Sequence, residues 1–416
     1  MKKKILLKGP LLTRSGYGEQ ARYALRSLRS KSDIFDIYIQ PITWGSTSWI
    51  AEDNEERAWI DQAIEKTISF MQQGGNYDIS LQVTIPPEFE QIAPVNIGYT
   101  AGIETTKAHH QWIQKGNLMD KIIFISNHSK NVFNNSKYPV SNNQTGEQGI
   151  LENKTELCAI NYPVKTFEQL PELDLELTTD FNFLTVAQYS IRKNLENTIK
   201  WFVEEFADEN VGLVVKTNMA KNCLMDREMI FNKLRELVNS VNSETKCKVY
   251  LLHGDMTDDE IHALYTHPKL NAMVCLPHGE GFGLPLFEAH YSGMPIVTVG
   301  WSGQLDFLID EEGNENFYSV SYDVQPVQKE AVWDGVIMAD SMWAYARESS
   351  AKKNMRQCYN DCTNGEGIAL KAKEVISEVQ NRFNAEKMYD QFSSAVYDPS
   401  DEESQWLDNL SKIEIL

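Results

Sequence analysis

The stretch His278-Gly-Glu-Gly-Phe-Gly-Leu-Pro-Leu-Phe-Glu-Ala-His290 decides the fold. It follows the apolar run Ala272–Leu276, which predicts a buried strand. Pro285 suits the first position of a helix, where a missing N–H costs nothing. Gly281 and Gly283 leave bare backbone at the helix entrance, and the peptide N–H groups and helix dipole there favour an anion or sugar hydroxyls. The stretch therefore predicts a strand, a glycine loop and a helix that begins at a ligand site.

Two carboxylates accompany this predicted helix. Glu280 lies just before it, and we place Glu288 in its first turn. Both can point into one cleft, where carboxylates accept hydrogen bonds from vicinal diols. The alternative is a plain strand–turn–helix whose glutamates only complement the helix dipole.

Outward from this stretch, short apolar runs alternate with amphipathic ones, which is typical of parallel sheets with crossover helices. The first half contains five predicted strands: Ile5–Leu7, Ile37–Ile39, Ile79–Val83, Val95–Tyr99 and Ile122–Ile125. The second half contains five more: Phe183–Val186, Leu213–Val215, Val249–Leu252, Ala272–Leu276 and Ile296–Val299. Helical spacing covers Leu195–Phe206 and Met256–Tyr265.

The two α/β halves are joined between about Tyr162 and Asp180, through Pro163-Val-Lys-Thr-Phe-Glu-Gln-Leu-Pro171. The turn-rich stretch Ser141–Gly149 predicts a surface loop. The tail from Glu366 to Val396 has helical period, and the acidic stretch Asp398–Glu403 after it is expected to be mobile.

Charge and composition narrow the class of protein. The chain has 416 residues and a formal net charge of -20, which argues against a sequence-independent grip on nucleic acid. No window approaches the roughly 18 apolar residues of a membrane helix. The six cysteines form no CxxC pair and no zinc-like spacing. We therefore expect free thiols, a cytoplasmic location and no strong membrane or nucleic-acid binding.

A second candidate site follows the strand Phe183–Val186, in Val186-Ala-Gln-Tyr-Ser-Ile-Arg-Lys-Asn194. Arg192 and Lys193 are adjacent cations at a strand-to-helix turn, which suits a diphosphate whose charge must be neutralised as it leaves. A solvated basic pair is the alternative. Lys216, at the end of Leu213–Val215, is another cation at the same sheet edge.

A third candidate is the glycine pair in Lys8-Gly-Pro-Leu-Leu-Thr-Arg-Ser-Gly-Tyr-Gly-Glu19. Gly16, Tyr17 and Gly18 follow the first strand and allow close approach of backbone to a phosphate or sugar. An ordinary tight turn explains them equally well, and the spacing does not match GxGxxG.

The segment from Glu280 to Glu288 resembles the EGFGLPxxE signature of retaining glycosyltransferases of the large family 4 group, which have the GT-B fold. The resemblance implies that Glu280 contacts the donor sugar and that Glu288 binds the ribose of the nucleotide. It also implies that backbone at Gly281, Phe282, Gly283 and Leu284 touches sugar and phosphate. The loop at Ser302-Gly303 resembles the family's next glycine loop.

The resemblance is incomplete after the strand Phe183–Val186. The family usually has Gly-Arg early in this loop and Lys near its end. Lys193 matches that Lys, whereas Gln188 stands at the usual position of Arg. Arg192 or Lys216 is the substitute for the missing cation. A glycine-rich loop after the first strand closes over the donor phosphates in the family, which implies that role for Gly16, Tyr17 and Gly18.

Relatives also place a His or an acid after the fourth strand, on the reactive face of the sugar. In Gly98-Tyr-Thr-Ala-Gly-Ile-Glu-Thr-Thr106 the best candidate is Glu104, with Thr100 beside it; a helix N-terminal acid is the alternative for Glu104. His109 and His110 look like helix surface, and the remaining candidates are His253, His278 and His290. The segment Asn381–Tyr389 resembles the family's closing helix, which packs back on the N-terminal domain.

Together these features predict an α/β protein of GT-B fold. We expect an N-terminal acceptor-side domain over 1–165, a donor domain over 166–375, and a returning helix with an acidic tail over 376–416. The resemblance implies retaining hexosyl or pentosyl transfer from a UDP-, GDP- or ADP-sugar. No DxD-type metal site is evident near these loops, so we expect no metal and no cofactor beyond that co-substrate. The acceptor stays open among a glycan, a lipid-linked sugar, a protein and a modified nucleobase. A sugar phosphorylase, an epimerase or a non-catalytic sugar-nucleotide-binding protein is the alternative.

Overall fold

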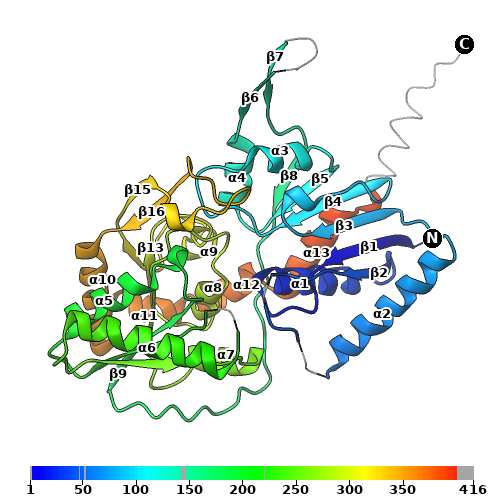
Figure 1. Cartoon of the computed structure of the whole chain (residues 1–416). Helices are drawn as coiled ribbons and strands as arrows, with labels where there is room; N and C mark the ends of the chain where they lie inside the picture. The colour runs from blue at the N-terminus through cyan, green and yellow to red at the C-terminus, as the bar shows by residue number, and fades with distance from the viewer. Residues whose placement is uncertain (1, 46, 51–52, 142–146, 220, 401–416) are drawn as a thin grey trace, which may run out of the picture.

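The chain folds around two six-stranded parallel sheets (Figure 1). The structure is a computed structural model that describes residues 2–45, 47–50, 53–141, 147–219 and 221–400. The first sheet has the order β2-β1-β3-β4-β5-β8. Its strands are β1 (Lys3–Gly9), β2 (Phe35–Pro41), β3 (Ile79–Val83), β4 (Val95–Thr100), β5 (Lys121–Phe124) and β8 (Glu156–Ala159). All five strands predicted for this half are confirmed.

The helices that belong to the first sheet are α1 (Gly16–Ser30), α2 (Glu55–Gln72), α3 (His110–Gly116) and α4 (Asn127–Asn135), with the 3-10 turn η1 (Pro86–Glu88). A hairpin of β6 (Tyr138–Ser141) and β7 (Gln148–Leu151) projects from this domain (Figure 1). The prediction of a loop over Ser141–Gly149 was therefore wrong at its ends, which pair as strands. Its centre, 142–146, lies outside the described residues, as do 401–403 of the predicted mobile stretch.

The second sheet has the order β11-β10-β9-β12-β13-β14. Its strands are β9 (Phe181–Val186), β10 (Val211–Lys216), β11 (Lys248–Leu252), β12 (Ala272–Cys275), β13 (Ile296–Val299) and β14 (Tyr318–Val320). Its helices are α5 (Leu195–Phe206), α6 (Leu224–Val241), α7 (Asp258–Tyr265), α8 (Leu284–Tyr291), α9 (Leu305–Leu308), α10 (Glu348–Asn364) and α11 (Gly367–Glu374), with η2 (Ile191–Lys193). Counted within the domain, this is the 3-2-1-4-5-6 order of a Rossmann fold, which reverses between β9 and β12.

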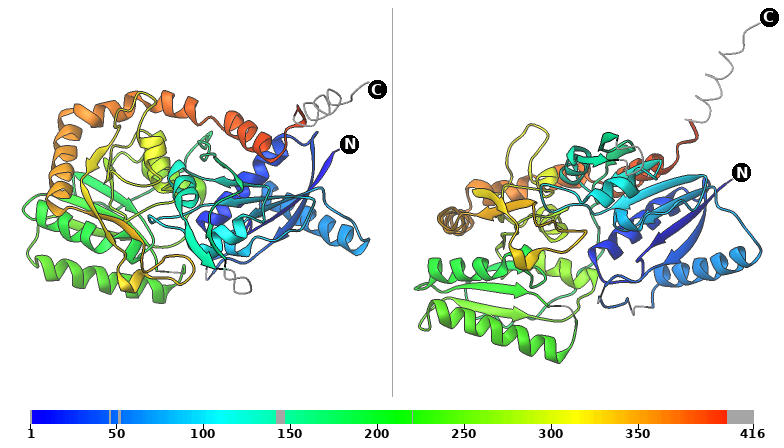
Figure 2. Two further views of the ribbon diagram at one scale, coloured as in Figure 1. Left: turned by 90° about the horizontal axis from the view of Figure 1, so that it is seen from above. Right: turned by 45° about the horizontal axis from the view of Figure 1, so that its top comes forward.

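The C-terminal helices cross from the second domain back to the first (Figure 2). α12 (Ile376–Arg382) packs on α8, whereas α13 (Ala385–Val396) packs on α1. The Tyr23 hydroxyl in α1 donates to the Met388 carbonyl at 3.1 Å. This helical run and residues 160–180, which connect β8 to β9, are the two covalent crossings between the domains.

One apolar core continues from the first domain into the second, next to the two covalent crossings. One cluster of buried side chains includes Leu7 and Leu81 of the first sheet together with Met273 of the second and Phe287 of α8. Such a shared core holds the facing strand ends of the two sheets in a defined relation. The second domain also carries a two-stranded hairpin of β15 (Tyr322–Pro326) and β16 (Met342–Ala346), with η3 (Lys329–Ala331) in the connecting segment.

Candidate active site

The loops after β9 and β12 flank the point where the second sheet reverses its strand order. Ligands of open α/β sheets bind outside the carboxyl ends of the strands at such a point. The loop after β9 carries Arg192 and Lys193 in η2, and the loop after β12 carries Glu280 and leads into α8. The structure thus brings together the two strongest motifs of the sequence.

Glu280 is fixed through its backbone. The Ser302 hydroxyl accepts from the Glu280 N–H at 2.9 Å, and the Gly303 N–H donates to the Glu280 carbonyl at 3.0 Å. Ser302 reaches this place with φ 79°, a left-handed conformation that costs a non-glycine residue energy. The Ser302 hydroxyl itself donates to Gln304 Oε1 at 2.8 Å. The loop after β13 is therefore strained into the shape that holds Glu280.

The carboxylate of Glu280 lies between two cations. Lys193 Nζ is 2.6 Å from Oε1, and Arg192 Nη1 is 3.1 Å from Oε2. Arg192 also donates to the Gly279 carbonyl at 2.8 Å, and its Nη2 lies 3.8 Å from Glu104 Oε1 in the first domain. The sequence candidates Glu280, Lys193, Arg192 and Glu104 thus form one charge cluster across the cleft.

Burial acts against the charge of Glu280, whose side chain is 8% exposed. Although burial by itself raises its pKa, Lys193 and Arg192 outweigh that effect and hold the pKa of Glu280 below its ordinary value. For Arg192, burial alone lowers the pKa, and the neighbouring Glu280 and Glu104 reverse this and raise it. Glu280 and Arg192 therefore stabilise each other's charged forms.

The first domain approaches this loop so closely that only glycine fits. A Cβ on Gly279 would lie 2.0 Å from the Glu104 carbonyl oxygen, and one on Gly281 would lie 2.4 Å from that of Ala101. Gly283 has φ 92°, which disfavours a side chain. Gly279 and Gly281 thus admit the backbone of the other domain in this structure.

This contact makes a prediction for Gly281→Ala. The added methyl group should push the domains apart at the cleft and cost about 1–3 kcal/mol of stability in the closed arrangement, because the neighbouring atom is backbone. Small-angle scattering should show a larger radius of gyration. Gly16→Ala is the matched control, because its Cβ would meet no atom within 4 Å. Equal scattering profiles for both variants would contradict the close approach.

Glu288 lies in different surroundings from Glu280. α8 begins at Leu284, so Pro285 is the second helical residue and Glu288 falls in the second turn; our placement of Glu288 in the first turn was wrong. Its carboxylate accepts from the Tyr265 hydroxyl at 3.1 Å. Burial raises the pKa of Glu288 to about 7, which nearby Lys165 opposes. Glu288 is therefore poised to change its charge near neutral pH.

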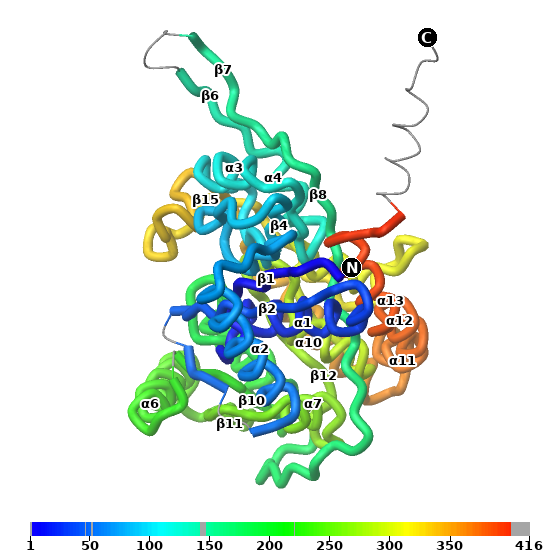
Figure 3. The backbone as a smooth tube through the Cα atoms, turned by 90° about the vertical axis from the view of Figure 1, so that its right-hand side faces the viewer, coloured from blue at the N-terminus to red at the C-terminus, as the bar shows by residue number. Residues whose placement is uncertain are grey.

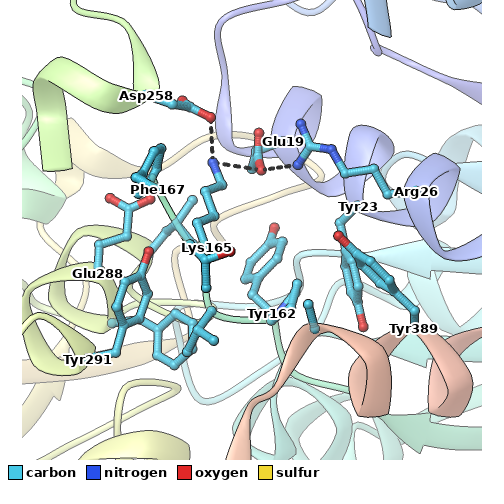
Figure 4. A pocket seen from close by; sticks show the side chains of 16 residues that line it. Glu19, Tyr23, Arg26, Tyr162, Lys165, Phe167, Asp258, Glu288, Tyr291 and Tyr389 are labelled. Atoms are coloured by element: carbon cyan, nitrogen blue, oxygen red, sulfur yellow. Dashed lines mark hydrogen bonds and ion pairs between the residues drawn. The ribbon is translucent and has the colours of Figure 1, made fainter. Parts of the chain in front are cut away.

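Glu288 lines a cavity of about 250 Å³ where both domains and their connection meet (Figure 4). Lys165, in the connecting segment, spans it with contacts of 2.9 Å to Glu19 of α1 and 2.8 Å to Asp258 of α7. The remaining wall consists of aromatic, charged and small side chains: Tyr23, Arg26, Tyr162, Pro163, Val164, Thr166, Phe167, Leu284, Phe287, Tyr291, Ala385 and Tyr389. Sequence reasoning missed Lys165, since a lone cation between two prolines gives no signal of its partners.

Most of the second domain is similar to a known protein family. Residues 171–329 match the family model described as glycosyl transferases group 1. The match covers the loops that carry Arg192, Lys193 and Glu280, so this part of the chain is similar to that family. The search of curated proteins found no match.

Solved structures of glycosyltransferases share the fold of almost the whole chain. HepE of Anabaena, in complex with UDP and glucose, has a TM-score of 0.58 at 12% identity and covers 94% of this chain and 98% of its own. Sucrose-phosphate synthase of Thermosynechococcus elongatus has a TM-score of 0.60 at 12% identity, with coverage of 94% and 98%. A UDP-forming trehalose-phosphate synthase of Burkholderia xenovorans has a TM-score of 0.58 at 10% identity, with coverage of 96% and 100%. The predicted GT-B fold is confirmed.

Within this glycosyltransferase fold, the two candidates for the missing cation differ. Gln188 is exposed and donates to the Met219 carbonyl at 2.6 Å, away from Glu280. Lys216 donates to the Gly254 carbonyl at 2.5 Å, and burial lowers its pKa. Arg192 contacts Glu280 directly. The geometry therefore favours Arg192, although the donor-binding role of each residue stays a prediction.

Gly16, Tyr17 and Gly18 form the first turn of α1 rather than a loop before it, and their contacts lie inside the first domain. A Cβ on Gly18 would lie 2.1 Å from the Thr13 carbonyl oxygen. The Tyr17 hydroxyl is hydrogen-bonded to Thr100 at 2.8 Å, and its ring stacks on Trp44 with centroids 4.0 Å apart. Gly18 is therefore explained by the close packing of the start of α1 on Thr13, and not by a tight turn before the helix. Donor contacts of Gly16, Tyr17 and Gly18 stay predictions.

Each histidine candidate lies in a setting that is explained by the fold: a helix cap, a helix surface, a hydrogen bond or burial. His109 caps the start of α3 and His110 is exposed, as expected for helix surface. His253 Nε2 is 2.9 Å from Asp226, and His290 is buried in α8. His278 is also buried, between the second sheet and β16.

One histidine near the cleft was missed. His128 of α4 meets the ring of Trp301 edge to face, with centroids 5.0 Å apart, across the two domains. Burial lowers the pKa of His128 to about 4. Only the fold brings these rings together, so no local pattern could have revealed the pair.

Among the residues that the structure describes, no group of three or more His, Cys, Asp or Glu side chains is arranged to hold a metal ion. None of the helices in the same residues has the length and apolarity needed to span a bilayer.

Proposed function

We propose that this chain transfers a hexosyl or pentosyl unit, with retention and without a metal ion, from a UDP-, GDP- or ADP-sugar to an acceptor hydroxyl. The observation that carries the proposal is the cluster of Lys193, Glu280 and Arg192 beside the N-terminus of α8. Two cations and a helix dipole there match a diphosphate, and a buried carboxylate matches sugar hydroxyls.

In this mechanism the donor replaces contacts that the protein now makes with itself. The diphosphate forms an ion pair with Lys193 in place of Glu280. One oxygen of Glu280 is then available to accept hydrogen bonds from sugar hydroxyls. As the bond between the anomeric carbon and the phosphate oxygen breaks, Lys193 and the N–H groups at Gly283 and Leu284 stabilise the charge on the leaving group. The acceptor hydroxyl attacks from the same face, and its proton passes to the leaving phosphate. Glu104, next to Arg192, lines that face.

In the same proposal, Glu288 accepts hydrogen bonds from the ribose hydroxyls of the nucleotide, beside the cavity that Lys165 spans. The positive charge already present at Lys193 and Arg192 is the reason to expect that no metal is needed, and activity that survives a chelator would test this. The six cysteines are all free, which fits a cytoplasmic location. The acceptor remains a glycan, a lipid-linked sugar, a protein or a modified nucleobase.

A thermal-shift screen of UDP-, GDP- and ADP-sugars tests donor binding. A donor present at 100 times its dissociation constant adds about 2.7 kcal/mol to the stability of the folded state. Release of nucleoside diphosphate from that donor then separates an enzyme from a binding protein. A requirement for inorganic phosphate would identify a phosphorylase, and a change in the sugar without release of diphosphate would identify an epimerase.

The raised pKa of Glu288 predicts a pH dependence of UDP binding. Above pH 7 the carboxylate is charged and accepts from ribose hydroxyls more strongly, whereas below pH 7 it gains a proton. With a pKa of about 7, UDP should bind about tenfold more weakly at pH 6 than at pH 8. Calorimetry at the two pH values measures this.

Glu288→Gln is the control for this experiment, because it keeps the shape of the side chain and removes its titration. The variant should show only the pH dependence that arises from the diphosphate itself. If the variant and the natural protein have the same pH profile, Glu288 does not bind the ribose in its charged form.

A further inference from the structure

A segment of the second domain lies on the first domain, on the side of the cleft away from the covalent crossings. We call residues 327–341, which connect β15 to β16, the strap. In Figure 3 the β15 region lies beside α3. Trp112 Nε1 in α3 donates to the Gly335 carbonyl at 2.7 Å, and Lys107 Nζ is 2.5 Å from Asp340. Val336 packs against the buried apolar cluster of α3 and β5.

Met342, the first residue of β16 and the residue directly after the strap, is hydrogen-bonded to Thr106 of the first domain. The Thr106 N–H donates to the Met342 carbonyl at 2.9 Å, and the Met342 N–H donates to the Thr106 hydroxyl oxygen at 3.0 Å. The Tyr138 hydroxyl lies 3.4 Å from Met338 Sδ. Strap and first domain are therefore joined by polar and apolar contacts that open together if the domains separate.

The base of the strap is anchored on His278. His278 Nδ1 is 2.6 Å from the Ala344 carbonyl, so Nδ1 carries the proton and Nε2 accepts from Gln328 at 3.1 Å. Trp343 stacks on the imidazole with centroids 4.9 Å apart and donates through Nε1 to Gln328 Oε1 at 2.9 Å. Every polar atom of this ring has a partner, which fixes its position.

His278 in turn joins the strap to the charge cluster. The Ala344 N–H donates to the His278 carbonyl at 2.9 Å, and the His278 N–H donates to the Arg192 carbonyl at 2.8 Å. His278 stands two residues before Glu280, and Thr106 stands two residues after Glu104. The strap thus connects the two acids that face each other across the cleft.

We propose that the strap sets the position of Glu280 relative to Glu104 when the domains close, with His278 as the positioning residue. The reaction that this serves rests on the proposed function; the coupling itself rests on the contacts above. Closure through the strap also shields the cleft on the side that the covalent crossings leave open. Because the docking contacts are few, they can form and break together as the domains close and open.

The test weakens the docking end of the strap and measures the effect at its base. Trp112→Phe removes the indole donor and keeps an aromatic ring, and Asp340→Asn removes the ion pair with Lys107. Asp323→Asn is the matched control, because Asp323 of β15 pairs at 2.5 Å with Arg347, directly after β16, and both residues belong to the second domain. Hydrogen exchange of the full chain measures the amides of Met342 and His278, and small-angle scattering measures the domain separation.

The Trp112→Phe/Asp340→Asn double variant should exchange the amides of Met342 and His278 at least fivefold faster and have a larger radius of gyration, with Asp323→Asn unchanged. UDP should bind within about threefold of the natural protein, whereas release of UDP from the accepted donor should slow by roughly fivefold or more. If exchange at His278 and the scattering profile stay as in the control, the proposal is overturned. Exchange and scattering need no donor, so they decide the coupling even if the proposed function fails.

Discussion

Lys193→Ala is expected to lower turnover of the sugar donor by about 10²-fold while the fold survives. Lys193 lies at the switch point of the second sheet, 2.6 Å from Glu280, where its charge is available to a departing diphosphate. A cation that acts where charge develops contributes mainly to the transition state, and one such group in a closed site is typically worth about 10²–10³-fold. Steady-state rates of diphosphate release and a thermal melt measure both parts of the prediction.

The matched control is Lys352→Ala. Lys352 also lies 2.6 Å from a glutamate, Glu204, but on the outer helices α10 and α5. Its loss should leave turnover unchanged. Lys193→Arg should restore part of the activity, since it returns the charge with a different geometry. If Lys193→Ala retains activity within a few-fold of the natural protein, Arg192 or Lys216 carries the charge on the leaving group instead.

The sequence predicted the sheets well because parallel strands in an α/β protein are buried on both faces. Such strands appear as short, nearly continuous apolar runs, and Ile79–Val83 coincides with β3. Leu195–Phe206 coincides with α5, whose apolar face has helical period. The helix predicted over Met256–Tyr265 begins with a full capping box, in which the Thr257 hydroxyl accepts from the Glu260 N–H and the Glu260 carboxylate accepts from the Thr257 N–H.

For the candidate site, the sequence predicted the individual loops but not how they come together. The strand–loop–helix around Glu280 and the turn with Arg192 and Lys193 are local features, and the sheet topology brings them together. Glu288 was misplaced by one helical position, and so falls in the second turn, because α8 starts one residue before Pro285. The difference matters, because at its true position Glu288 lines the cavity that Lys165 spans and lies apart from Glu280.

Local sequence patterns could not predict the contacts between the two domains. The strap docks through single residues, such as Trp112 and Gly335, that are more than 200 positions apart. Lys165 finds Glu19 and Asp258 only once both domains are folded. Ser302 gives no sign of its positive φ, because serine is ordinary in any loop. These interactions depend on the arrangement of the two sheets, which no window of sequence contains.

Glu280→Gln is expected to lower transfer by about 10²-fold and to weaken discrimination between donors that differ at one sugar hydroxyl. The amide keeps the size of the side chain and loses the charge that accepts from two hydroxyls. Small misplacement of a reacting carbon can cost about 10²-fold. Affinity for the bare nucleoside diphosphate should stay the same or increase, because Lys193 and Arg192 lose the carboxylate that now holds them.

Glu204→Gln is the matched control for this change. Glu204 is likewise held by two cations, Lys352 at 2.6 Å and Lys200 at 3.9 Å, but it lies on α5, away from the cleft. Calorimetry with UDP and transfer rates with a pair of epimeric donors separate the two functions of the cluster. If UDP affinity collapses in Glu280→Gln while the preference between epimers persists, Glu280 serves the nucleotide or the fold. The sugar would then be held by another group, of which Glu104 is the nearest, because Arg192 already links it to the cluster.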